Sequence, residues 1–176
     1  MNSTRDDLID LSNFAFDRLR TRMQGLTDEE YLWEPVPGCR TVRPVADGTF
    51  RSDGPASEGS ERVFTTLAWR LAHILFLLAE ERNGPWLGVP HTCPEWSGDP
   101  GTATDALDRL DIAYACWRGV LEASDDESLA EAIGPVSRFY GESTRRAFVL
   151  HILDELIHHG AEAALLRDLY AAQPSG

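Results

Sequence analysis

The sequence predicts an all-α protein, a four-helix bundle with long loops after the first and second helices. Four long segments carry apolar residues at helical spacing, and stretches rich in glycine and proline separate them. Alternating patterns typical of strands are scarce, and no region is a convincing strand. The 176 residues are enough for one sizeable core, and neither a repeat nor a domain boundary is apparent. We therefore expect one helical domain over residues 1–176.

The first helix should begin at Thr4, a good N-terminal cap, and continue to about Gly25. Its apolar positions recur at roughly helical spacing: Leu8, Leu11, Phe14, Phe16, Leu19 and Met23. Thr27 and Glu30 then form a capping-box pattern, which predicts a short helix that stops before Pro35. Residues 35–61 should form a long loop, of a length that is often functional.

The second helix is expected over residues 62–82, apolar on nearly every side and therefore deeply packed. Asn83 and Gly84 can end this helix, and Pro85 cannot continue it. A second loop, "GPWLGVPHTCPEWSGDPG", follows it.

The third helix should run from a cap at Thr104 to about Ala123. It would turn six apolar residues inward: Ala106, Leu110, Ala113, Trp117, Val120 and Leu121. Ser124 can cap a short extra turn. The last helix should start at Ser143 or Thr144 and end near Ala172.

The composition restricts the class of partner. A formal net charge of −13 argues against nucleic acid and against an anionic membrane surface, but not against a small-molecule substrate. All basic residues are arginine, which excludes a Schiff-base lysine. Charges at the N-terminus and the lack of a membrane-length apolar run predict a soluble, cytoplasmic protein. Cys39, Cys93 and Cys116 have no CxxC spacing, so free thiols are expected.

The last helix places polar groups on its apolar face. Glu155 and His159 lie four residues apart, so their side chains can converge at the edge of a stripe that includes Phe148 and Ile152. An unpartnered buried carboxylate costs several kcal/mol. A buried arginine, a neutral histidine or a divalent metal could each compensate, and a structural Glu155–His159 pair is as good an interpretation as a metal site.

A metal site needs a further donor from a facing helix, and His73 is the candidate. It lies in the middle of the apolar second helix, where a lone histidine is otherwise most simply a satisfied core residue. Together, His73, Glu155 and His159 form a two-histidine, one-carboxylate set that suits zinc, nickel or iron and leaves a coordination position open. The HExxH protease motif is absent.

Other polar residues are weaker candidates. His91 and Cys93 could belong to a second metal site, although a plain loop is the simpler interpretation. His158 could be an acid or base, but an exposed helix position is expected for it, as for His151 and Asp154. Two further residues could reach the site: Arg70, to orient an anionic substrate, and Glu162, at the rim. For Arg70 the alternative is a solvated surface role, and for Glu162 it is a surface salt bridge to an arginine.

Three stretches of the sequence resemble a known family: "GLTDEEYLWEPVPG", "LAWRLAHILFLLAEERNGPWLG" and "HILDELIHHGAEAALLRDLY". They are similar to the DinB-like superfamily of metal-binding four-helix bundles. Many members bind a divalent metal through a histidine on the second helix and two on the last, which correspond to His73, Glu155 and His159. The glutamate departs from the all-histidine pattern and resembles the N-terminal domain of mycothiol-dependent maleylpyruvate isomerases.

The resemblance implies a metal-dependent enzyme that uses a thiol such as mycothiol, with zinc the first choice of metal and nickel or iron the alternatives. His73, Glu155 and His159 would hold the metal, the loops 35–61 and 83–103 would form the rim, and no catalytic or thiol-binding residue is assigned. A possible homodimer is also implied. Two alternatives stay open: a non-catalytic, metal-stabilised binding or stress-response bundle, and a metal-assisted hydrolase with metal-bound water as the nucleophile.

Overall fold

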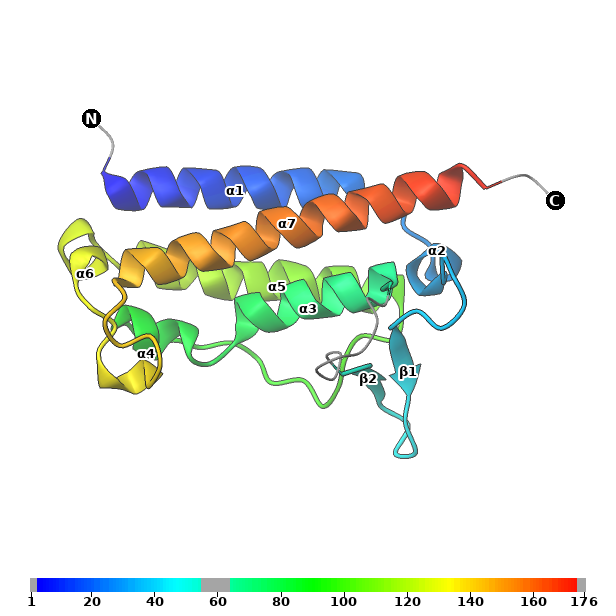
Figure 1. Cartoon of the computed structure of the whole chain (residues 1–176), viewed down its shortest axis with the longest axis horizontal. Helices are drawn as coiled ribbons and strands as arrows, with labels where there is room; N and C mark the ends of the chain where they lie inside the picture. Colours follow the sequence, from blue (N-terminus) through cyan, green and yellow to red (C-terminus); the bar gives the residue numbers. More distant parts are fainter. Residues whose placement is uncertain (1–2, 55–63, 174–176) are drawn as a thin grey trace.

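Four long helices lie side by side and form a bundle (Figure 1). The structure, a computed structural model, describes residues 3–54 and 64–173. The long helices are α1 (Thr4–Arg22), α3 (Leu67–Ala79), α5 (Ala103–Glu122) and α7 (Arg145–Ala171). Helix α7 packs against α1 and α3, and α5 packs against the same two helices. The predicted all-α bundle is therefore confirmed.

Side-chain caps begin the helices, at positions that differ slightly from the predicted ones. Ser3, not Thr4, caps α1, and Thr102, not Thr104, caps α5. Thr27 caps α2 (Asp28–Leu32), and Thr144 caps α7, both as predicted. Asp125, not Ser124, caps α6 (Asp126–Ala130), which precedes the 3-10 turn η1 (Pro135–Ser137). In each capped helix, a side-chain oxygen accepts an N–H that has no partner within the helix.

The apolar second helix, α3, is shorter than predicted. Thr66 caps it, and it ends after Ala79 because Glu80 has an extended backbone (φ −59°, ψ 129°). Asn83 does not simply terminate the helix: its buried amide donates to the carbonyls of Leu77 and Leu78. A new short helix, α4 (Asn83–Leu87), follows, with Pro85 in its first turn, where a missing N–H costs nothing. Residues 62 and 63 of the predicted helix lie outside the described residues.

The first long loop contains two short strands that the sequence analysis missed. Strands β1 (Val42–Pro44) and β2 (Phe50–Ser52) pair antiparallel. The turn between them uses Asp47, whose carboxylate accepts from Thr49, and Gly48, which adopts φ 84°. An Asp-Gly pair is a good hairpin signal, but only three residues pair on each side, too few to show an alternating pattern.

The core lies between the four long helices. The six inward residues predicted for α5 are all buried, with Trp117 fully so. In α1, Leu8, Phe16, Leu19 and Met23 are buried as predicted, but Leu11 and Phe14 are exposed. No helix in the described ranges is long and apolar enough to span a bilayer.

A buried ion pair joins the far end of α7 to α2 and to the end of α1. Arg167 donates to both carboxylate oxygens of Glu30, at 2.6 and 2.9 Å. It also donates to the carbonyls of Arg22 and Gln24, at 2.6 and 2.8 Å. The Glu30 side chain is only 8% exposed, so Arg167 compensates a charge that water cannot reach.

Replacing Arg167 by alanine should destabilise the fold by roughly 3–5 kcal/mol, because it leaves a buried carboxylate unpaired. Urea unfolding measures the loss. Arg118→Ala is the matched control: its pair with Glu122 is about half exposed on both sides and should contribute less than about 1 kcal/mol. Equal effects of the two substitutions would contradict the prediction.

A disulfide joins the second loop to α5, which corrects the expectation of free thiols. Cys93 and Cys116 are bonded, with their Cα atoms 5.6 Å apart, and Cys39 is free and buried. The two bonded cysteines are 23 residues apart, and the folded loop brings them together where no sequence motif does.

Reduction of this disulfide with dithiothreitol should lower the melting temperature by roughly 6–12 °C, because the cross-link restricts the unfolded chain by about 3 kcal/mol. Calorimetry with and without the reductant measures the shift. Cys116→Ser protein should melt at the same lower temperature under both conditions. Finding three titratable thiols in unreduced, unfolded wild-type protein would show that the bond does not form.

Candidate metal centre

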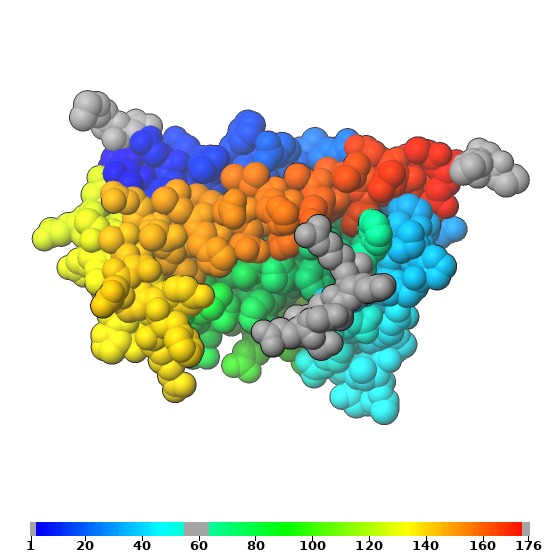
Figure 2. Space-filling view, viewed as in Figure 1, coloured from blue at the N-terminus to red at the C-terminus, as the bar shows by residue number. Residues whose placement is uncertain are grey.

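Helices α3 and α7 bring together the three side chains that the sequence analysis selected. The Oε2 atom of Glu155 lies 3.0 Å from Nε2 of His159 and 3.5 Å from Nε2 of His73. The two imidazole rings meet edge to face, with centroids 4.7 Å apart. One donor atom from each residue lies within 4.8 Å of the others. The three residues thus form one cluster on two facing helices, with α7 exposed beside α3 along one face of the molecule (Figure 2).

His73 enters the cluster from the middle of α3. The indole of Trp69, one turn earlier, stacks on its ring at 5.3 Å, and the indole N–H donates to the carbonyl of Asp53. Burial, followed by the nearby His159, lowers the pKa of His73. The ring is therefore neutral at neutral pH, which is the form that binds a metal.

His159 is the most buried member of the cluster, at 8% exposure. While its Nε2 faces Glu155, its Nδ1 lies 2.7 Å from Oε2 of Glu162. Arg70 lies 3.0 Å from that same Glu162 oxygen and 3.0 Å from Nδ1 of His159. The imidazole is therefore held between two carboxylates, with a guanidinium beside it.

The donor set fits a small divalent cation. Zinc ligands lie about 2.0–2.2 Å from the ion, so tetrahedral donors are roughly 3.3–3.6 Å apart. Of the two separations from Glu155, 3.5 Å lies within this range and 3.0 Å lies slightly below it. Among the described residues, no arginine forms an ion pair with Glu155; its partners are the two histidines. Two imidazoles and one carboxylate are ligands that zinc, nickel and iron accept.

The side chains of His73 and Glu155 are 30% and 26% exposed, so one side of the cluster is open to solvent. A small molecule can approach from that side.

Arg70 and Glu162 lie beside His159. A solvated role for Arg70 is wrong, because its side chain is only 18% exposed and is paired with Glu162. Glu162 forms the predicted salt bridge to an arginine, and it also reaches the imidazole of His159. The spacing of three residues between His159 and Glu162 is compatible with this contact. The approach of Arg70 could not be predicted from spacing, because Arg70 lies on the facing helix α3.

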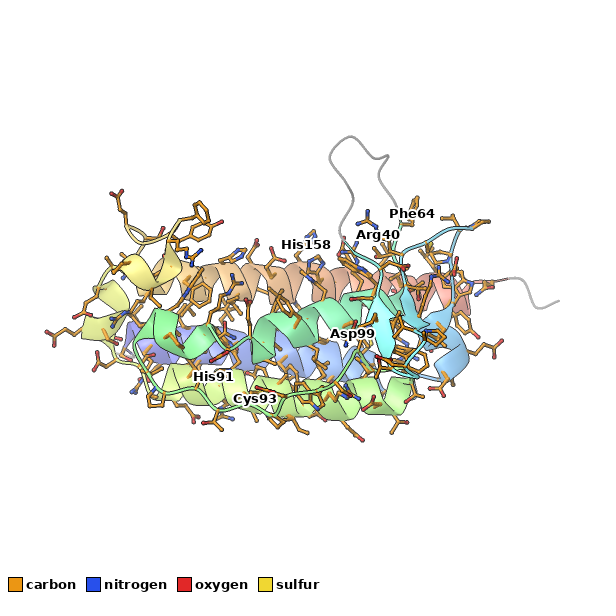
Figure 3. The ribbon with its side chains drawn as sticks, turned by 90° about the horizontal axis from the view of Figure 1, so that it is seen from below. Arg40, Phe64, His91, Cys93, Asp99 and His158 are labelled. Atoms are coloured by element: carbon orange, nitrogen blue, oxygen red, sulfur yellow. A yellow bond between two sulfur atoms is a disulfide. The ribbon has the colours of Figure 1, made fainter. Side chains whose placement is uncertain are left out.

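Among the weaker candidates, His158 lies beside His159, with the ring centroids 4.7 Å apart, whereas His91 and Cys93 lie on the other side of the bundle (Figure 3). His151, Asp154 and His158 are exposed, as expected. His91 contacts the carbonyl of Ala79, and Cys93 is in the disulfide. Within residues 3–54 and 64–173, neither belongs to a group that could hold a metal, so the plain-loop interpretation holds.

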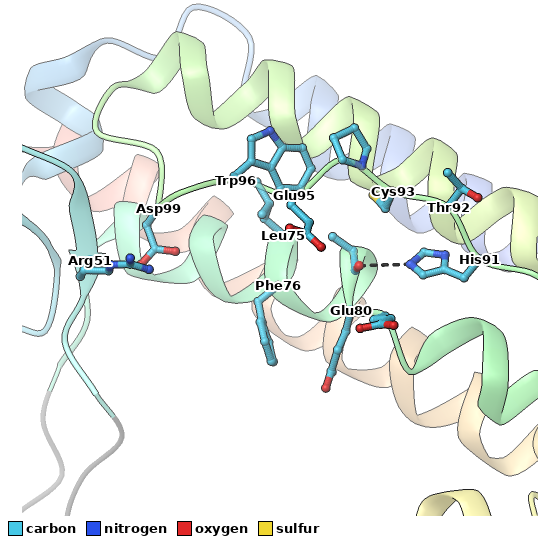
Figure 4. A pocket seen from close by; sticks show the side chains of 14 residues that line it. Arg51, Leu75, Phe76, Glu80, His91, Thr92, Cys93, Glu95, Trp96 and Asp99 are labelled. Carbon is cyan, nitrogen blue, oxygen red and sulfur yellow. Dashed lines mark hydrogen bonds between the residues drawn. The ribbon is translucent and has the colours of Figure 1, made fainter.

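A separate pocket of about 630 Å³ lies between α3 and the second loop (Figure 4). Phe76 lines it from α3 and Glu80 from just after the end of that helix, and His91, Trp96 and Asp99 line it from the loop. None of the three clustered residues contributes to it. The described part of the first loop, by contrast, reaches the cluster through the Trp69–Asp53 hydrogen bond.

The fold and the cluster define a class: a four-helix bundle with a potential metal centre between two of its helices. The chain belongs to the DinB superfamily, whose family model matches residues 13–163. It is also similar to a solved structure described as the conserved protein of locus from Enterococcus faecalis, with a TM-score of 0.59 and 16% identity over 98% of this chain and 100% of that chain. At this identity the likeness shows the fold alone. No curated protein matches the chain.

Replacing His159 by alanine should abolish stoichiometric binding of zinc, because two donors from facing helices hold a cation far more weakly than three. Calorimetric titration of metal-free protein measures the binding. His158→Ala is the matched control, because the His158 side chain is 59% exposed and should be dispensable for binding. Full zinc occupancy in the His159→Ala protein would refute the ligand assignment.

Proposed function

We propose that the protein is a divalent-metal-dependent enzyme that transfers a low-molecular-weight thiol, of the mycothiol type, to a small electrophile, or isomerises such a substrate through a thiol adduct. The observation that carries the proposal is the convergence of His73, Glu155 and His159 within 4.8 Å, on a side that is open to solvent. We infer zinc as the metal, with nickel or iron as alternatives, because imidazole and carboxylate ligands suit all three.

A bound divalent cation would supply Lewis acidity that lowers the pKa of a thiol and so provides a nucleophilic thiolate. The protein's own residues would hold and orient the components. His73, Glu155 and His159 are the proposed ligands, and Trp69 restrains the His73 ring by stacking on it. The carboxylate of Glu155 would balance one positive charge of the ion, so that the site carries less excess charge than an all-histidine site.

A cleft of about 330 Å³ borders the Arg70–Glu162 side of the cluster, although none of the three proposed ligands lines it. Arg70 and Glu162 form its polar edge, and Phe64, Leu165 and Leu169 are among its apolar walls. This is the size and character of a pocket for a small organic molecule. The net charge of −13 supports a small-molecule substrate over nucleic acid or an anionic membrane. A homodimer and a cytoplasmic location stay predictions.

Zinc-loaded protein should conjugate mycothiol to a model electrophile such as a chlorodinitroarene, and the same protein without the thiol should not turn it over. Absorbance of the thioether product measures the rate, and elemental analysis of freshly purified protein measures the metal. The His159→Ala protein is the control for reaction in solution.

The other outcomes separate the alternatives. Turnover of ester substrates that needs metal but no thiol would identify a hydrolase. Metal-dependent melting without turnover of any electrophile would identify a non-catalytic bundle. Protein that binds no divalent metal would contradict the proposal itself.

A further inference from the structure

We propose that Glu162 is a positioning residue, which fixes the proton of His159 on Nδ1 and leaves Nε2 as the metal donor, and that Arg70 holds Glu162 in place. The inference rests on the proposed function in one respect: it takes His159 to be a metal ligand. It assigns new roles to two residues that contact neither His73 nor Glu155 in any hydrogen bond or ion pair of the described residues.

The distances around Nδ1 of His159 determine where its proton lies. An ionised carboxylate can only accept hydrogen bonds, so the 2.7 Å contact between Nδ1 and Oε2 of Glu162 requires a hydrogen on Nδ1. Arg70 is 3.0 Å from Nδ1, but a guanidinium only donates and cannot bond to a nitrogen that already carries a proton. Arg70 also forms an ion pair with Glu162, whose Oε2 atom lies 3.0 Å from the guanidinium nitrogen. The imidazole and the guanidinium thus both face one carboxylate.

This arrangement has a direct consequence at the other side of the ring. With Nδ1 directed at Glu162, Nε2 is the ring nitrogen that faces Glu155, at 3.0 Å, and is the one available to a metal. A carboxylate that accepts from the distal nitrogen orients a ligating histidine and raises its basicity. The burial of His159 reinforces this effect, because water competes little for a nitrogen on a side chain that is only 10% exposed.

A competing interpretation makes Glu162 a ligand of a second cation. His158, His159 and Glu162 also offer three donor atoms within 4.8 Å of one another. The charge of Arg70 argues against such a site, because it lies 3.0 Å from both Nδ1 of His159 and Oε2 of Glu162. A cation between these atoms would meet a permanent positive charge at close range in a half-buried position. Glu162 is therefore better explained as the partner of His159.

Calorimetric titration of the full-length, metal-free chain with zinc tests the proposal on Glu162→Ala, Glu162→Gln and wild-type protein. The alanine variant should bind zinc about 10- to 100-fold more weakly with unchanged stoichiometry, because the outer hydrogen bond is lost. The glutamine variant keeps an acceptor and should recover a large part of the affinity. Asp154→Ala is the matched control: it removes one negative charge from the exposed side of α7 and should change the affinity little.

A second measurement separates positioning from general stability. In the long-range ¹H–¹⁵N spectrum of the zinc-loaded protein, His159 should bind zinc through Nε2 and carry its proton on Nδ1 in the wild type, and this preference should be weakened in Glu162→Ala. An unchanged affinity in that variant, an equal loss in Glu162→Gln, or the loss of a second equivalent of zinc would each overturn the proposal. If wild-type protein bound no zinc, the proposed function would fail. If wild-type protein bound zinc and the Glu162→Ala protein bound it with the same affinity, only this inference would be wrong.

Discussion

The site depends on one constraint: a carboxylate in the middle of α7 must face two imidazoles across the contact between α7 and α3. Glu155 is about a quarter exposed, so its charge is only partly solvated, and His73 and His159 are its partners. The register of the two helices determines whether these groups meet. Buried residues on both sides of the contact hold that register, among them Leu71 and Ile74 on α3 and Ile152 and Leu156 on α7. A shift of one helical turn, about 5.4 Å, would separate the donors beyond the reach of a single ion.

Helix α7 also links several parts of the bundle. It contacts α1 and α3 along its length and α6 near its start, and Arg167 ties its far end to Glu30 and to the end of α1. The second long loop depends on a different anchor, the disulfide between Cys93 and α5. The parts that surround the cluster are thus fixed by packing and buried charge, whereas the separate pocket has a covalently attached wall.

The local electrostatics differ from those of the whole chain. The net charge is −13, yet Arg70 is placed beside His159 and Glu162 at the edge of the cluster. The groups therefore lie in a row: the carboxylate of Glu155, which is the proposed inner ligand, then the imidazole of His159, then the ion pair of Glu162 with Arg70. Such an arrangement is typical of metal sites in which outer groups orient the ligands, and it gives each titratable side chain at this point a partner.

The sequence by itself determined the four long helices, the caps of α2 and α7, and the three candidate donors, because helical periodicity and spacing are local properties. Glu155 and His159 had to lie on one face of one helix, and His73 was the histidine in the middle of the apolar second helix. Only the tertiary structure decided what no local pattern encodes. Three contacts join distant segments: the disulfide between Cys93 and Cys116, the ion pair of Arg70 with Glu162, and the ion pair of Arg167 with Glu30. Such contacts depend on the relative position of packed helices and loops, which spacing along a single chain does not specify.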